Sequence, residues 1–67
     1  MITVTKKENE KIIKDGSIAL LELSGLSTDE KPIELGTTKI ENGSTYIEID
    51  TGKIYLFDLE NKQWKEI

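Results

Sequence analysis

Apolar and polar residues alternate along the C-terminal part of the chain, and turn sequences interrupt the alternation at short intervals. A period of two residues places one face of a β-strand against a core. Three strands are predicted on this basis, at Thr45–Asp50, Lys53–Asp58 and Gln63–Ile67. Three turns are predicted beside them, at Asn42-Gly43, Thr51-Gly52 and Leu59–Lys62. Residues 42–67 are therefore expected to form a three-stranded β-meander.

Two registers compete for the first hairpin of this meander. A two-residue loop at Thr51-Gly52 would separate an aliphatic face from an aromatic face. Its cross-strand pairs would be Ile49 with Ile54, Ile47 with Leu56, Glu48 with Tyr55, and Tyr46 with Phe57. A three-residue loop with Gly52 in a bulge position would avoid the positive φ that threonine disfavours. We favour the first register because it sorts the side chains by face.

A second hairpin is predicted near the N-terminus. Asp15-Gly16 is a strong two-residue turn signal, and it separates Glu10–Lys14 from Ser17–Leu23. Ten isoleucines and seven threonines favour pleated surfaces over helices along the whole chain. The expected fold class is all-β, with a small antiparallel sheet of about five to six short strands in a single domain over residues 1–67.

A short N-terminal helix is the alternative for residues 6–14. Thr5 and Glu8 have the spacing of a capping box, which would begin a helix that ends at Lys14. Only Ile12 and Ile13 would give that helix an apolar face. Strands are therefore favoured over a helix in this segment.

Residues 24–39 are predicted to be an irregular loop. Three dipeptides in this range disfavour regular structure, namely Ser24-Gly25, Asp29-Glu30 and Lys31-Pro32. A long loop without attachment is unusual in a small domain. Three apolar residues are expected to attach it to the core, namely Leu26, Ile33 and Leu35.

The composition excludes several kinds of chemistry. The chain has no cysteine and no histidine, so it lacks the usual ligands of zinc and iron–sulfur sites and the usual base of nucleophilic catalysis. Glu48 or Asp50 beside Asp58 could form a carboxylate pair for glycoside hydrolysis. Solvated acids at strand ends are the preferred interpretation. We expect no enzyme activity, no catalytic residues, no cofactor and no metal.

Charge and hydropathy restrict the partners. The net charge is −4, and nine lysines without any arginine argue against nucleic acid. The N-terminus does not have the form of a signal peptide. The longest apolar run, Ile18–Leu21, is far shorter than the roughly 20 residues that span a membrane. Self-association is expected instead, because so small a core has no disulfide to support it.

All four aromatic residues fall in the meander, and they are Tyr46, Tyr55, Phe57 and Trp64. The preferred interpretation places them in the core or in one wall of it. They are also the possible interaction surface of the chain, because aromatic rings with polar groups suit a protein interface or the stacking of sugars. Three interpretations thus stay open: core, protein interface and glycan site.

The C-terminal sequence resembles a module of bacteriophage and prophage proteins of Gram-positive bacteria. Its pattern is G-S-T, an aromatic residue, any residue, E, an apolar residue, D-T, any residue, K, an apolar residue and Y. A turn, a tryptophan and a short apolar end follow. Residues 42–58 and 61–67 match this pattern, and Lys11–Ser17 and Leu23–Pro32 are similar to small phage reading frames.

This resemblance implies a non-enzymatic structural or virion-assembly protein, such as a head-fibre or tail-associated component. Such a protein acts by association with itself or with other virion proteins. It would be found in the bacterial cytoplasm during assembly and then in the virion. The chain lacks the heptads or long repeats of a fibre shaft, which favours a compact module. The sheet edge at Gln63–Ile67 is the expected pairing site. A small carbohydrate-binding module is the alternative function.

Overall fold

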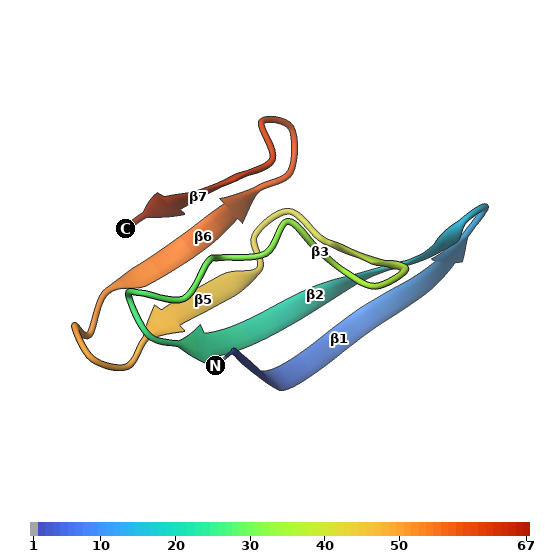
Figure 1. The fold of residues 1–67 in the computed structure, drawn as a ribbon. Helices are drawn as coiled ribbons and strands as arrows, with labels where there is room; N and C mark the ends of the chain where they lie inside the picture. The colour runs from blue at the N-terminus through green and yellow to red at the C-terminus, as the bar shows by residue number, and fades with distance from the viewer. Residues whose placement is uncertain (1) are drawn as a thin grey trace.

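The computed structural model describes residues 2–67, and it is an all-β fold (Figure 1). These described residues form seven strands, namely β1 (Thr3–Ile13), β2 (Gly16–Gly25), β3 (Glu34–Leu35), β4 (Thr38–Ile40), β5 (Thr45–Glu48), β6 (Ile54–Asp58) and β7 (Gln63–Glu66). The alternative of an N-terminal helix is wrong, because residues 6–13 belong to β1. Among the described residues, no helix has the length and apolar character to cross a membrane.

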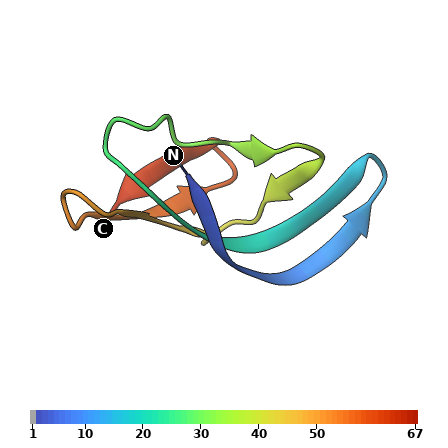
Figure 2. The same ribbon diagram turned by 60° about the horizontal axis from the view of Figure 1, so that its bottom comes forward.

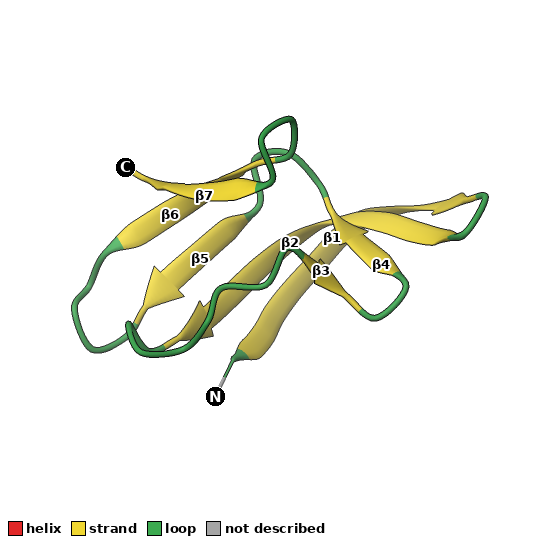
Figure 3. Cartoon of the chain, turned by 45° about the horizontal axis from the view of Figure 1, so that its top comes forward, coloured by secondary structure: helices red, strands yellow, loops and turns green. Residues whose placement is uncertain are grey.

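The sheet is mixed, whereas a purely antiparallel sheet was expected. β2 pairs antiparallel with β1 along one edge, and it pairs parallel with β4 and then with β5 along the other edge (Figure 3). The strand order is β3-β4-β2-β5-β6-β7, and β1 lies on the other side of β2. A parallel pair needs a crossover of about a dozen residues, and the segment between β2 and β4 has that length.

The predicted N-terminal hairpin is confirmed, with its turn one residue earlier than expected. Ile13 pairs with Gly16, so the two loop residues are Lys14 and Asp15. Both strands are longer than expected, and the hairpin extends to one side of the meander in Figure 2. This projection contributes to the elongated shape of the molecule, which measures 37 × 21 × 18 Å.

The predicted irregular loop is shorter than expected. β2 continues to Gly25, and the segment ends in the small hairpin of β3 and β4. Of the three expected apolar anchors, only Leu35 packs against the core. Leu26 and Ile33 are exposed, so their predicted role is wrong. Polar groups attach this segment instead, as described below.

The C-terminal meander is confirmed, but neither predicted register is correct. Tyr46 pairs with Tyr55, and Ile47 pairs with Ile54. Five residues, 49–53, connect β5 to β6, and the Gly52 amide donates to the Glu48 carbonyl over 2.8 Å. Gly52 has a φ of +77°, which glycine adopts without strain. The shift from the favoured register is an even number of residues, so the aromatic and aliphatic faces stay separate.

The core lies on one face of the sheet, which we call the inner face. β2 alternates strictly between buried and half-buried residues, as a strand with one covered face must. The buried apolar side chains are Ala19, Leu21, Leu23, Ile40, Tyr46 and Phe57. Buried Ser44 lies where β2 changes partner from β4 to β5. Its hydroxyl accepts from the Leu21 amide over 3.0 Å and donates to the Glu41 carbonyl over 2.7 Å, so it replaces a missing strand partner.

Candidate functional site

The four aromatic residues that formed the possible interaction surface lie together on the inner face. Tyr46 and Phe57 are buried, whereas Tyr55 and Trp64 are half-buried. The Trp64 ring centroid lies 4.9 Å from that of Phe57 and 5.9 Å from that of Tyr46. The core interpretation is therefore correct for Tyr46 and Phe57. These two rings offer no exposed surface to a partner.

The segment that leaves β2, drawn in green in Figure 1, binds to this aromatic cluster through polar contacts. The Trp64 indole N–H donates to the Pro32 carbonyl over 2.7 Å. The Tyr46 hydroxyl donates to the Leu26 carbonyl over 3.2 Å. The Ser27 amide and hydroxyl both donate to the Asp50 carboxylate, over 2.9 and 2.6 Å. Side chains of the meander thus bind the backbone and side chains of the crossover.

A partly buried ion pair completes this arrangement. Lys31 Nζ lies 2.8 Å from Glu48 Oε2, and the two side chains are only 20% and 4% exposed. The Thr51 hydroxyl donates to the other Glu48 oxygen over 2.6 Å. The ammonium also lies 4.4 Å from the ring centroid of Tyr55 and 5.0 Å from that of Tyr46, within the range of cation–π attraction.

The electrostatics of this pair favour its charged state. The hydrogen bond to Glu48 raises the pKa of Lys31 above its ordinary value. The hydrogen bonds from Lys31 and Thr51 lower the pKa of Glu48. A lysine acts as a base only when burial without a counter-ion lowers its pKa, and here the counter-ion has the opposite effect. Lys31 therefore stays protonated at neutral pH, and the pair attaches the crossover to β5.

The three acids that could have formed a carboxylate pair are occupied separately. Glu48 binds Lys31, and Asp50 binds Ser27. Asp58 accepts from the Asn61 side-chain amide over 2.8 Å, and this contact lowers the pKa of Asp58. Within residues 2–67, no group of three or more acidic side chains is placed to hold a metal ion. These acids stabilise turns and the crossover.

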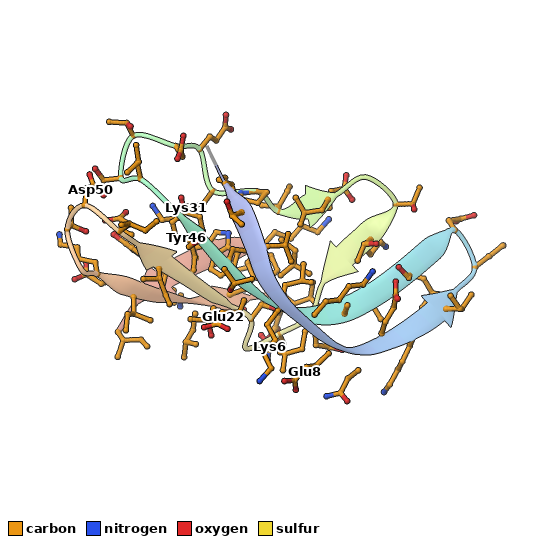
Figure 4. All side chains as sticks on the ribbon, turned by 90° about the horizontal axis from the view of Figure 1, so that it is seen from below. Lys6, Glu8, Glu22, Lys31, Tyr46 and Asp50 are labelled. Carbon is orange, nitrogen blue, oxygen red and sulfur yellow. The ribbon has the colours of Figure 1, made fainter. Side chains whose placement is uncertain are left out.

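The opposite side of the sheet, which we call the outer face, shows a different composition. Its cross-strand rows follow from the register, because paired residues point to the same side. One row contains Ser24, Ile47, Ile54 and Ile67, and the next contains Lys6, Glu22, Thr45, Leu56 and Lys65. Ile54, Leu56 and Ile67 are 41%, 42% and 76% exposed. In Figure 4, Lys6 and Glu22 lie on this side, and Lys31 and Tyr46 lie on the other.

Sequence reasoning identified the aliphatic face but missed the ion pair. Alternation within β5 and β6 was enough to place Ile47, Ile54 and Leu56 on one side. Lys31 and Glu48 are 17 residues apart, and no local pattern distinguishes that lysine from the other eight. The lysine stands before Pro32, which indicates an extended backbone but not a buried partner.

Comparison of the chain with protein-family models, with curated proteins and with solved structures finds no match.

Proposed function

We propose that this protein is a non-enzymatic structural component of a bacteriophage or prophage particle and acts by protein–protein association. The resemblance of residues 42–67 to phage proteins supports the class of protein. The single observation that supports association is the exposed aliphatic row of the outer face. There Ile54 and Ile67 are adjacent across β6 and β7, and Leu56 lies beside them.

The outer face is better suited to association than the sheet edges. The exposed β1 contains two register shifts, and Asn9 beside one of them has a φ of +53°. Such bulges, together with charged side chains, prevent an edge from pairing with another chain. The expected pairing edge, β7, is indeed at one end of the sheet, but it is only four residues long and includes Lys65 and Glu66. Adjacent aliphatic side chains provide the apolar centre that interfaces have.

The aromatic residues do not support the alternative of a carbohydrate-binding module. Stacking of a sugar needs an exposed ring face. Tyr46 and Phe57 are buried, and the Trp64 N–H already donates to Pro32. Lys31 lies over the half-buried ring of Tyr55.

The proposal is tested with an epitope-tagged chain in the bacterial strain that encodes it. Particles are purified on a density gradient after induction of the prophage, and their proteins are identified by mass spectrometry. We expect the tagged chain to sediment with capsid or tail proteins. We expect Ile54→Asp to reduce its incorporation, and Ile12→Asp, on the β1–β2 hairpin, to leave incorporation unchanged. Particles that lack the chain, or flanking genes that form a metabolic operon, would refute the proposal.

A further inference from the structure

We infer that the partner of the outer face is a second copy of this chain, packed sheet against sheet about a two-fold axis. This inference rests on the proposed function, because it names the partner of the same surface. It depends on the order of charges along one cross-strand row. That row begins at Lys6 on β1 and continues from Glu22 on β2 through Thr45 and Leu56 to Lys65 on β7.

Glu22 on β2 and Lys65 on β7 have opposite charges that the single chain does not pair with each other. Within residues 2–67, the half-buried Glu22 carboxylate forms no ion pair. Its neighbour across the strand, Lys6, forms its ion pair with Glu8, and its attraction to Glu22 is a weaker contribution to the raised pKa of Lys6. Lys65 lies 3.6 Å from Asp58, and its side chain is largely exposed. The Lys65 ammonium therefore has hydrogens free for a second carboxylate.

A two-fold axis joins these charges. Consider an axis between two face-to-face sheets that runs along the strand direction, midway between β5 and β6. It exchanges β2 with β7 and β5 with β6, so each Lys65 meets the Glu22 of the other copy. Leu56 then meets Thr45, and Ile47 meets Ile54. The contact is self-complementary, as a two-fold interface requires, and its two ion pairs flank an apolar centre.

The size of the surface determines the strength of this contact. Four strands about 4.8 Å apart are roughly 15–20 Å wide, and the two rows are about 7 Å apart along the strands. Such a patch buries less than the roughly 1,200 Å² of a stable interface. We therefore expect a weak dimer, with a dissociation constant of about 100 µM, that forms where copies are concentrated.

Sedimentation velocity from about 10 µM to about 1 mM measures this equilibrium. We expect the wild-type chain to change from monomer to dimer across that range. Ile67→Asp places a charge in the apolar row and should leave only monomer. Ile12→Asp is the matched control, because Ile12 is 85% exposed but lies at the other end of the molecule in β1. It should dimerise as the wild type does, and Trp64 fluorescence reports whether each variant is folded.

Charge exchange tests the two-fold geometry itself. Glu22→Lys and Lys65→Glu should each weaken the dimer about tenfold, because each change affects two symmetry-related ion pairs. The double variant should recover most of the wild-type affinity. Monomer alone at about 1 mM, dimerisation that survives Ile67→Asp, or a double variant as weak as either single variant would overturn the inference.

These outcomes are distinguishable from failure of the proposed function. A chain that stays monomeric but still incorporates into particles through the outer face binds another virion protein, which overturns the second copy as partner and preserves the function. A dimer that is absent from particles refutes the function and preserves the dimer.

Discussion

Gly16→Ala tests how the β3–β4 hairpin is attached to β2. Gly16 is the first residue of β2, and it has a φ of +139°. A Cβ at this position would overlap the carbonyl oxygen of Thr37, which is a backbone atom and cannot move away by a change of rotamer. The same carbonyl accepts from the Ser17 amide over 3.0 Å. An alanine therefore has to displace the whole hairpin.

The expected loss of stability has two parts. A positive φ that favours glycine costs a residue with a Cβ about 1–3 kcal/mol. Displacement of the hairpin also breaks the Ser17–Thr37 hydrogen bond and the hydroxyl contact between Ser17 and Thr38, which measures 3.0 Å. At about 1 kcal/mol for each hydrogen bond, the second part is about 2 kcal/mol. The sum, about 3–5 kcal/mol, is a large fraction of the roughly 5–15 kcal/mol that typically stabilises a domain.

Urea unfolding of Gly16→Ala and Gly43→Ala separates the two parts. Gly43 also has a positive φ, +88°, but a Cβ there would meet no atom within 4 Å. Its substitution costs only the backbone part, so Gly16→Ala should be the less stable variant by about 2 kcal/mol. Equal losses in the two variants would refute the proposed attachment by Thr37.

Three further predictions concern the core, the crossover and the ion pair. Leu23→Ala removes a fully buried side chain and should lower the free energy of unfolding, measured in urea, by about 3 kcal/mol. Leu56→Ala on the outer face should lower it by under about 1 kcal/mol. Similar losses in the two variants would contradict the assignment of faces. Tyr46→Phe removes the hydrogen bond to the Leu26 carbonyl, should cost about 1 kcal/mol, and should speed amide exchange in residues 26–33 rather than in β6. Acid should destabilise the fold. The ordinary pKa of a glutamate is 4.5, and the hydrogen bond that Lys31 donates to Glu48 lowers the pKa of Glu48 below that value. Its stabilisation is fully present above pH 4.5 and is lost as the pH falls through the lower pKa of the folded state. The urea concentration at the unfolding midpoint should therefore decrease as the pH is lowered from 4.5, and Glu48→Gln should make that decrease smaller.

Local signals predicted the local parts of the fold. Asp15-Gly16 and Asn42-Gly43 marked turns, and alternation marked the strands that they join. Alternation determines which face a residue occupies, but it does not determine its partner across the sheet. The prediction for the hairpin at Gly52 therefore placed its side chains on the correct faces, although the predicted register differed from the observed one by an even number of residues. The Glu48–Gly52 hydrogen bond that sets the longer loop leaves no pattern in the sequence.

Contacts between distant segments were outside the reach of this reasoning. The parallel pairing of β2 with β4 and β5 depends on where the crossover returns. Ser44 enables β2 to change partner through its hydroxyl. Serine is also a common turn residue, so the sequence alone does not indicate this role. The same difficulty applies to Lys31, because a charged residue beside a proline normally indicates an exposed loop. Burial of Lys31 depends on Glu48, whose own position depends on the register of β5.

The crossover also explains why the two faces of the meander differ. Alternating strands present two surfaces, and within residues 2–67 the segment between β2 and β3 binds to only one of them. It binds there through backbone carbonyls and one ammonium, which need the hydroxyl, the indole N–H and the carboxylate that the inner face supplies. The outer face offers aliphatic side chains at the equivalent positions, and these cannot bind such a polar segment. A matching surface for them has to be apolar at its centre with charges at its rim, and the outer face of a second copy has that composition.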